Sequence, residues 1–392
     1  MAIRFEKIEG RSLMFYLWSF LLTALVLGGA YATYLMNEYG MFLSGLTNRI
    51  PWGIQAVLAD YYIGMAVGCM VIAALYDAVG KMEYGSFSRI AVFLALLFSV
   101  AALLSIMANQ GRLDRFLTRS FIHFNPSSLS SLKAFFYSTF GLICCVFLYA
   151  LYTEKHKLAK IVSLIGILWA IVLHSRTGYI FGLFPRDLYG SPLAPPTFIA
   201  AAVASGIAAL IIVTVVLFKL TKRNLNCGPL LRTGRVLSIV LIAAFCLVAA
   251  ENIFRIIQTE TRHAALFFLF SGFHSFLFWL GWVLLGCIFP VSILFRKNIT
   301  ISKVVLASVL VAVGVLCKCW LLVLPGLMFP PDLFSRWEIV AESAVTQEGI
   351  VGYSSSFPEL TQAFGIFGLI GLLFLWGMKF LELVPKETEV PQ

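Results

Sequence analysis

Long apolar runs alternate with short polar segments along the whole chain, and this alternation predicts its elements. A helix that crosses a bilayer needs roughly 20 mostly apolar residues. Ten runs reach that length, at about 13–36, 54–78, 87–108, 129–152, 158–180, 193–220, 234–258, 264–288, 301–328 and 359–383. The pattern predicts an all-α integral membrane protein with about ten transmembrane helices in one membrane domain, residues 1–392. Residues 13–29 are similar to a signal peptide, but the run continues to Met36, and we interpret it as the first membrane helix.

Two of these runs begin alike, which indicates an internal duplication. Both follow a proline-containing segment and carry small residues, Gly64 and Gly68 in the second helix and Ala200–Ala204 in the sixth. Small residues let transmembrane helices pack closely. We therefore expect two parallel four-helix bundles, formed by helices two to five and six to nine. The chain then divides into four parts. Residues 13–53 are the first helix and its outer loop, residues 54–180 the first bundle, residues 193–328 the second bundle, and residues 329–392 an outer loop with the last helix.

The composition also indicates that lipid is the solvent of this chain. Hydrophobic residues make up 60% and charged residues only 12%, whereas a soluble domain carries about 25% charged residues. The net charge of +10 does not indicate a nucleic-acid partner, because the positive residues lie mostly in loops on one side of the membrane. Alternate loops on the side of the N-terminus hold about 18 Lys and Arg, and the loops on the other side hold about ten. Cytoplasmic loops carry such an excess, so we expect both termini in the cytoplasm and the chain in the cell membrane.

Two predicted outer loops, at 109–128 and 329–358, are longer than the others. The first carries Arg112, Arg115 and Arg119 on a side that should be poor in positive charge. The second is rich in acidic residues, namely Asp332, Glu338, Glu342 and Glu348. Because arginine binds carboxylates in a bidentate way, the three arginines predict a docking surface for an extracytoplasmic partner. The alternative is that both loops are solvated caps, with the arginines paired to an acid of their own loop and to lipid phosphates.

The eight cysteines are dispersed, and no C-x-x-C spacing occurs. Iron–sulfur and zinc sites are usually built from closely spaced cysteines, so we expect no such site on this chain alone. Only His174 and His274 fall within predicted helices. A di-haem cytochrome b needs paired axial histidines on facing helices, so one haem would be the limit, and we expect none.

Ionisable residues inside the predicted helices mark the candidate site, because each costs about 2.5–3.5 kcal/mol at the centre of a membrane helix. Five of them share the outer half of the membrane although they come from four helices, namely Asp60, His174, Glu251, Arg255 and Lys318. Their common depth predicts a shared polar pocket or a proton path. Asp60 and His174 are the strongest pair, because further polar groups surround them in the sequence, namely Tyr61, Tyr62, Arg176 and Tyr179, of which Tyr62, Arg176 and Tyr179 are the candidate site residues.

Local alternatives stay open for the other ionisable residues. Glu251 and Arg255 are spaced i, i+4 and could simply neutralise one another. Lys318 could extend its ammonium toward the membrane surface. His274, near the middle of the eighth helix, is typical of a hydrogen-bonded core histidine. Asp77, near the cytoplasmic end of the second helix, is either part of a proton route or an ordinary interfacial carboxylate.

Several segments resemble the NrfD/PsrC family of quinone-interacting membrane subunits. Residues 45–53 resemble the family's G-L-T-x-x-I-x-W-G before helix two, and residues 109–116 resemble its D-L-G-R-P-x-R loop, departing at Gln110 and Leu113. Residues 124–128 resemble the N-P-x-S that follows, and residues 174–206 resemble its helix-five histidine, Pro-rich loop and small-residue helix. Residues 353–359 resemble the ending of the ten-helix DsrP branch, which belongs to the sulfite-reductase-associated DsrMKJOP complexes.

The resemblance implies a protein without cofactors of its own. Family members bind menaquinone near the extracytoplasmic face and exchange electrons with a ferredoxin-like iron–sulfur subunit docked there, beside other membrane and haem subunits. We therefore expect a menaquinone-binding membrane subunit of a respiratory oxidoreductase, with Asp60 and His174 as proton acceptors and with proton movement and sulfite reduction as associated roles. A secondary transporter with a polar site in the outer half of the membrane is the alternative.

Overall fold

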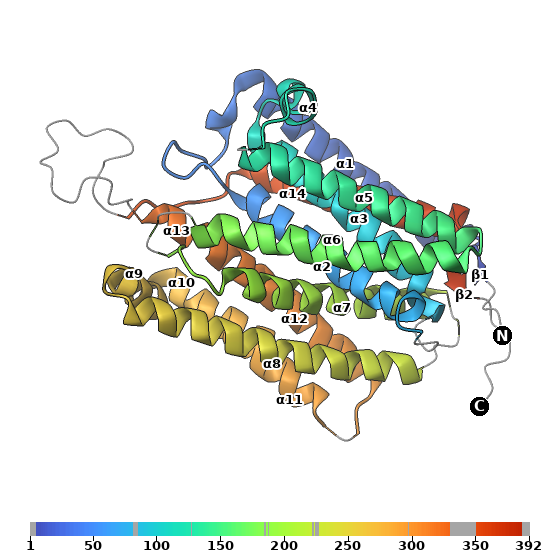
Figure 1. Cartoon of the computed structure of the whole chain (residues 1–392). Coiled ribbons are helices and arrows are strands. Elements are labelled where there is room, and N and C mark those ends of the chain that lie inside the picture. The colour runs from blue at the N-terminus through green and yellow to red at the C-terminus, as the bar shows by residue number, and fades with distance from the viewer. Residues whose placement is uncertain are drawn as a thin grey trace, which may run out of the picture.

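The computed structural model describes residues 5–80, 85–126, 128–183, 186, 188–221, 223, 227–296, 298–329 and 350–385. Within these ranges, ten helices are long and apolar enough to cross a membrane, which confirms the predicted all-α membrane fold. The helices run side by side along one direction (Figure 1). The chain is therefore a multi-pass integral membrane protein.

The helices between the first and the last form two groups of four. The first group consists of α2 (Ile54–Asp77), α3 (Gly85–Gln110), α5 (Leu129–Tyr152) and α6 (His156–Leu183). The second consists of α7 (Ala194–Leu220), α8 (Cys227–Ile257), the composite helix of α10 (Gly272–Phe276), η4 (Leu277–Ile288) and α11 (Phe289–Leu294), and α12 (Ile301–Val323). Neighbours within each group pack in a closed ring, as the expected pair of bundles requires.

The two bundles meet along α2 and α7, the helices whose small residues suggested a duplication. At the closest point, a Cβ added to Gly68 would lie 2.6 Å from the Cα of Gly206. A side chain at either position would force the backbones apart, because real Cβ atoms do not approach other atoms so closely. Small residues are thus the structural reason why the bundles can share this interface.

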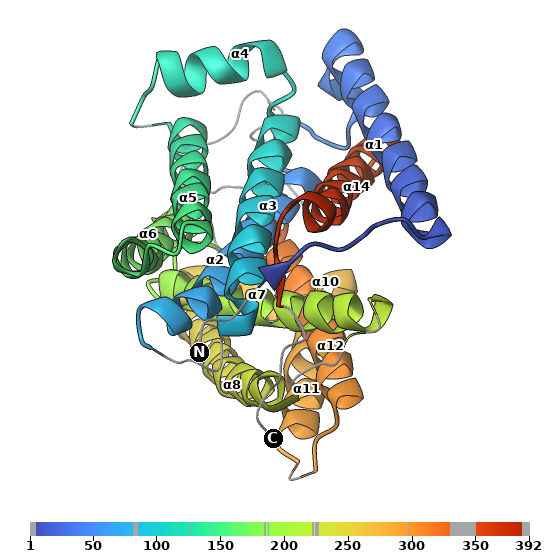
Figure 2. The same ribbon diagram turned by 90° about the vertical axis from the view of Figure 1, so that its right-hand side faces the viewer.

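The first and last spans lie outside the bundles. α1 (Leu13–Tyr39) packs on α14 (Phe357–Phe380), and α14 in turn contacts α3 (Figure 2). Short β1 (Phe5–Glu6) and β2 (Val384–Pro385) pair in an antiparallel way. Both described ends of the chain therefore lie at the same end of the helices, as the even number of spans predicts (Figure 1). We call the opposite end the distal end.

One predicted helix boundary is wrong. The run at 264–288 is divided in the structure, because α9 (Thr259–Phe270) ends before Gly272, which adopts a left-handed conformation with φ of 71°. The spanning helix is Gly272–Leu294. His274 therefore lies in the first turn of this span, close to its distal end, and not near its middle. The sequence hides the break because apolar residues continue on both sides of the Ser271-Gly272 turn.

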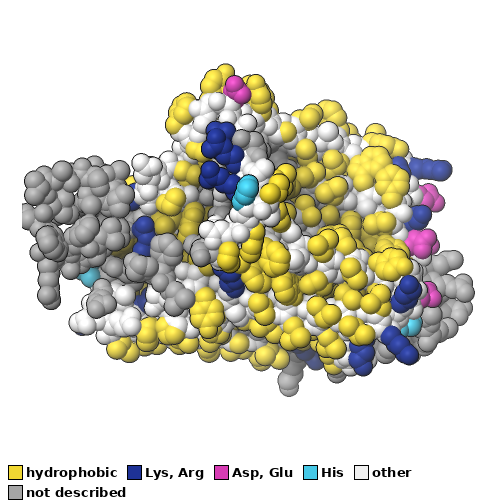
Figure 3. Space-filling model, turned by 45° about the horizontal axis from the view of Figure 1, so that its top comes forward, with side chains coloured by type: hydrophobic (Ala, Val, Ile, Leu, Met, Phe, Trp, Pro, Cys, Tyr) yellow, Lys and Arg dark blue, Asp and Glu magenta, His cyan; other side chains and the backbone are white. Residues whose placement is uncertain are grey.

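Shorter elements cover the distal end. They are η1 (Met41–Leu43), α4 (Leu113–Leu117), η3 (Thr118–Ile122) and α13 (Pro325–Met328). Figure 3 shows hydrophobic side chains over most of one face, with Lys and Arg gathered toward its ends. This distribution is what a protein with lipid on its sides and water at its two ends should have.

Candidate functional site

Three of the segments that resemble the family meet at the distal end of α2. The Glu359 carboxylate accepts a hydrogen bond from the backbone amide of Gly45 at 2.9 Å and another from the Tyr353 hydroxyl at 3.1 Å. The same hydroxyl accepts from the amide of Ile54 at 2.8 Å. Asn109, near the end of α3, hydrogen-bonds the loop before Ile54 through both atoms of its side-chain amide. These contacts satisfy amides that a helix start leaves unpaired, and they fix α2 in position.

Below this network lies a pocket with about 310 Å³ of empty volume, which we call the Asp60 pocket. It is lined from α2, α6, α7 and α12, and therefore lies where the two bundles meet. Asp60 and His174 both line it, as does Lys318, and each of the first two is buried. The structure thus brings together the two residues that sequence analysis ranked first.

Asp60 has partners that sequence analysis missed. The Lys133 ammonium lies 3.0 Å from Asp60 Oδ1, and the Tyr137 hydroxyl donates to the same oxygen at 3.3 Å. Asp60 Oδ2 is buried and has no hydrogen-bond partner among the described residues. Lys133 and Tyr137 are spaced i, i+4 on α5, which was the available signal. Lys133 was not considered among the intramembrane charges, although it lies within the run predicted at 129–152.

His174 presents a second unpaired atom. Its Nδ1 is buried without a hydrogen-bond partner in the described part of the chain. The Asp60 pocket therefore contains one carboxylate oxygen and one imidazole nitrogen that the surrounding protein leaves unsatisfied. Buried polar atoms normally have partners, so two such atoms in one pocket indicate a place for a polar ligand.

The other residues proposed beside them lie elsewhere. Tyr62 is buried and stacks on Phe98, with ring centroids 6.5 Å apart, outside the pocket lining. The Arg176 guanidinium lies over the Phe136 ring at 5.4 Å, and Tyr179 is 55% exposed on the outer surface of α6. Tyr61, rather than its neighbour, faces the pocket, and its hydroxyl donates to the Ala312 carbonyl at 3.0 Å.

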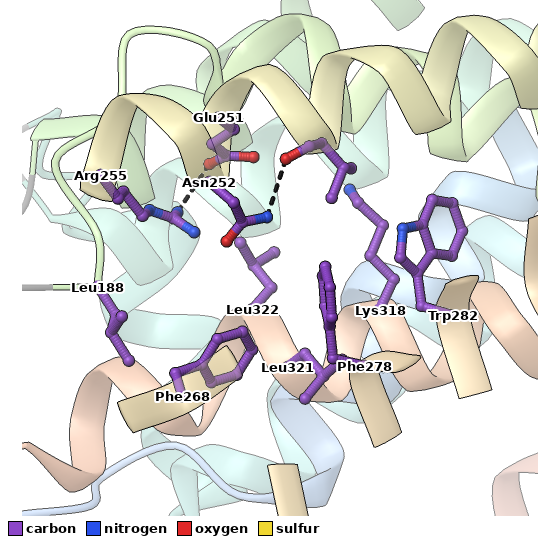
Figure 4. A pocket seen from close by; sticks show the side chains of 11 residues that line it. Leu188, Glu251, Asn252, Arg255, Phe268, Phe278, Trp282, Lys318, Leu321 and Leu322 are labelled. Carbon is purple, nitrogen blue, oxygen red and sulfur yellow. Dashed lines mark hydrogen bonds and ion pairs between the residues drawn. The ribbon is translucent and has the colours of Figure 1, made fainter. Parts of the chain in front are cut away.

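The remaining intramembrane charges line a second pocket, with about 500 Å³ of empty volume, inside the second bundle (Figure 4). Glu251 and Arg255 form an ion pair of 2.7 Å within α8, so the predicted i, i+4 contact exists. Lys318 lines both pockets, and its ammonium donates to the Thr197 carbonyl at 3.4 Å. This contact directs Lys318 into the protein interior and not toward the membrane surface. We call this second site the Trp282 pocket.

His274 and Asp77 lie outside both linings. The His274 ring stacks on Phe268 with centroids 6.4 Å apart, and its Nε2 lies 3.2 Å from the Met328 sulfur. Asp77 ends α2 at the opposite end of the molecule and accepts a hydrogen bond from the Ser88 hydroxyl at 3.3 Å. Burial raises the pKa of the Asp77 carboxyl to about 6, although the hydrogen bond from Ser88 lowers it.

The distal arginines are exposed. Arg112 precedes the first residue of α4, Arg115 lies in its last turn, and Arg119 lies in η3. The acidic residues of the second long loop, from Asp332 to Glu348, lie outside the described residues. Within the described ranges, no three His, Cys, Asp or Glu side chains gather in a group that could hold a metal ion.

Comparison with known proteins identifies the class to which this fold and these pockets belong. Residues 43–331 match the family model described as polysulphide reductase, NrfD. The chain therefore belongs to the NrfD family of polytopic membrane proteins. The match covers both bundles, including both pockets.

Relatives extend the similarity to almost the full chain. An Hdr-like menaquinol oxidoreductase integral membrane subunit from Archaeoglobus fulgidus is 33% identical, over 99% of this chain and 98% of the relative. A selenate reductase subunit from Mesobacillus selenatarsenatis is 24% identical, over 95% of both chains. A putative dimethyl sulfoxide reductase membrane subunit from Halobacterium salinarum is 25% identical, over 92% of this chain and 89% of the relative. These relatives are all subunits of oxidoreductases.

Proposed function

We propose that this chain is the menaquinone-binding membrane subunit of a respiratory electron-transfer complex, and that the quinone ring binds in the Asp60 pocket. The observation that carries the proposal is the pair of buried, unpartnered atoms in that pocket, Asp60 Oδ2 and His174 Nδ1, which have no partner among the described residues. The name of the Archaeoglobus relative supports menaquinol as the substrate.

The pocket fits the chemistry of a quinol. A quinol carries two hydroxyl groups, which are hydrogen-bond donors. In the pocket, Asp60 Oδ2 and His174 Nδ1 are acceptors that need donors. Oxidation removes two protons and two electrons, and these two acceptors would each receive a proton. Lys133, 3.0 Å from Asp60 Oδ1, supplies the countercharge that a buried carboxylate needs.

We propose that the electrons pass to an iron–sulfur subunit docked at the distal end, in a complex with further membrane and haem subunits. The excess of Lys and Arg at the end that carries the termini supports a cytoplasmic location for that end. The distal end, with Arg112, Arg115 and Arg119 exposed, then faces the extracytoplasmic side. The resemblance of residues 353–359 to the ending of the DsrP branch supports that branch and with it a role in sulfite reduction.

Substitution of His174 tests the quinone site. His174→Gln keeps a polar side chain of similar length but removes the base, so menaquinol-dependent reduction of the partner should fall by about 100-fold or more while the complex still assembles. His156→Gln is the matched control, because His156 is exposed at the other end of the same helix. Full turnover by a well-assembled His174→Gln complex would place the site elsewhere.

Charge reversal tests the docking surface. Arg112→Glu together with Arg115→Glu should release the iron–sulfur subunit at moderate salt, because like charges across an interface cost several kcal/mol. Lys157→Glu with Lys160→Glu, at the opposite end of the molecule, is the matched control. A complex that survives the distal reversal intact would exclude this surface as the dock.

A secondary transporter would need a different helix geometry. Such proteins use helices that are interrupted near the middle of the membrane. In the described spans, the break at Gly272 lies at a helix start near the distal end. The geometry therefore favours the electron-transfer function.

A further inference from the structure

The Trp282 pocket in the second bundle has no role in the function proposed above. It lies between α8, α9, η4 and α12, and it is separated from the Asp60 pocket by Lys318 and Leu322, which line both. Its empty volume of about 500 Å³ is the larger of the two. Three aromatic rings, from Phe268, Phe278 and Trp282, contribute to its walls.

Three polar atoms of this lining are buried without partners among the described residues. They are the indole Nε1 of Trp282, the Oδ1 of Asn252 and the Nε of Arg255. Trp282 is only 1% exposed and Asn252 only 7%. An unmade hydrogen bond at such a buried atom is costly. The two donors, from Trp282 and Arg255, point to a ligand with two acceptor oxygens, and Asn252 Oδ1 can accept from such an oxygen when it is a hydroxyl, as in a quinol.

The surrounding contacts fix these atoms in place. Asn252 donates its amide to the Val248 carbonyl at 2.8 Å, which leaves its oxygen for the cavity. Arg255 binds Glu251 through one terminal nitrogen, which leaves Nε–H as a donor without a partner among the described residues. Trp282 lies in η4, a π-helical segment of 12 residues. Such segments are uncommon and frequently occur at functional sites, and here the segment brings Phe278 and Trp282 to the same cavity.

The arrangement of these groups defines the ligand. In Figure 4, Arg255 and Asn252 lie at one side of the cavity and Lys318 and Trp282 at the other. Donors thus flank a space lined by aromatic rings. The Glu251 carboxylate is paired with Arg255, so Lys318 is the one ionisable side chain of the described lining that has no ion pair. A flat ring with an oxygen acceptor at each end matches this pattern.

We propose that the Trp282 pocket binds a second para-quinone ring, with one carbonyl toward Trp282 and Lys318 and the other toward Arg255. The proposal rests on the proposed function only in taking a quinone as the available ligand. Apart from Lys318 and Leu322, the residues that line the Trp282 pocket do not line the Asp60 pocket. Lys318 would then lie between two quinone rings, one where the bundles meet and one inside the second bundle.

Photolabelling of the intact complex tests this proposal. An azido-naphthoquinone is added to the complex in lipid nanodiscs, and the adducts are mapped to peptides by mass spectrometry. We expect adducts in α8 and η4 as well as in α2 and α6, all displaced by excess menadione. Trp282→Phe keeps the aromatic ring but removes the donor, so adducts in α8 and η4 should fall by about tenfold while those in α2 and α6 remain.

The matched control is Trp279→Phe. Trp279 lies in the same π-helical segment, but its indole donates to the Leu269 carbonyl at 2.8 Å and its side chain is 44% exposed. This change should leave adducts in both pockets. If Trp282→Phe prevents assembly, Phe278→Leu serves instead, because it removes one of the aromatic rings that line the cavity, and adducts in α8 and η4 should again fall while those in α2 and α6 remain.

Other outcomes of the photolabelling distinguish the quinone site in the Trp282 pocket from the one in the Asp60 pocket. Adducts confined to α2 and α6 would overturn the second site and leave the first. Adducts confined to α8 and η4 would support the second site and overturn the location of the first. Adducts in α8 and η4 that phosphatidylglycerol displaces but menadione does not would identify a lipid headgroup site and overturn the proposal, and the absence of any adduct would overturn both sites.

Discussion

The two bundles hold their buried charges in different ways. In the first bundle, Asp60 of α2 pairs with Lys133 of α5, so the ion pair joins two helices. In the second, Glu251 pairs with Arg255 of the same helix. An interhelical pair can form only when the bundle has assembled, whereas an i, i+4 pair is available to the isolated helix. The first pair therefore contributes to tertiary structure in a way that the second does not.

Removal of Lys133 should have the largest effect. Lys133→Met leaves the Asp60 carboxylate, whose side chain is 2% exposed, without its countercharge. Such a change should lower the free energy of unfolding by about 3–5 kcal/mol, measured by thermal unfolding of the purified protein in detergent. Adding Asp60→Asn should restore most of the stability, because neither buried group is then charged. A double variant no more stable than Lys133→Met would show that the pair does not act as a unit.

The interface between the bundles should be the next most sensitive. Gly68→Leu places a side chain where a Cβ alone would lie 2.6 Å from the Gly206 Cα, so the helices must separate. Overpacking of this kind costs about 1–3 kcal/mol, again measured by thermal unfolding. Gly352→Ala is the control, since its added Cβ would meet no atom within 4 Å. Equal stability of the two variants would contradict the close packing of α2 on α7.

A smaller loss is expected from the intrahelical pair. Glu251→Gln retains an oxygen that can accept from Arg255, and the Arg255 side chain is already 12% exposed. The expected loss in the free energy of unfolding is about 1–2 kcal/mol. A loss as large as that from Lys133→Met would mean that the two bundles do not differ in the way described above.

The smallest effect should come from Asp77, far from both pockets. Its pKa is raised to about 6 in the folded protein, against about 3.9 for an unfolded chain. Between roughly pH 4 and 6 the folded state retains a proton that the unfolded state has lost, so stability falls as pH rises through this window and is level above it. Because Asp77 is partly exposed, the change should be below about 1 kcal/mol.

Two variants check this pH dependence. Asp77→Asn should remove the fall in melting temperature between pH 4 and 6. Ser88→Ala removes the hydrogen bond that favours the carboxylate, so it should move the window to higher pH. The same slope in the wild-type and Asp77→Asn proteins would assign the pH dependence to another group.

The depths of the polar residues in the membrane were predictable from the sequence, whereas their neighbours were not. The distances of Asp60, His174 and Lys318 from their helix ends followed from counting residues along apolar runs. Counting residues did not show which faces of the helices turn toward one another, because these helices carry apolar residues on all sides. That is why Tyr62 was preferred to Tyr61 as a site residue although Tyr61 lines the pocket, and why Lys133 was not recognised as the partner of Asp60.

The sequence by itself determined the ten spans, the membrane class and the family, because the thickness of the bilayer fixes the length of an apolar helix and loop charge follows topology. The tertiary structure alone decided that the polar residues separate into two pockets with Lys318 between them. It also decided that α9 ends before Gly272 and that Asp60 reaches across to α5. These features depend on how the helices rotate and cross, and close contacts such as Gly68 with Gly206 set those rotations only after the bundles have met.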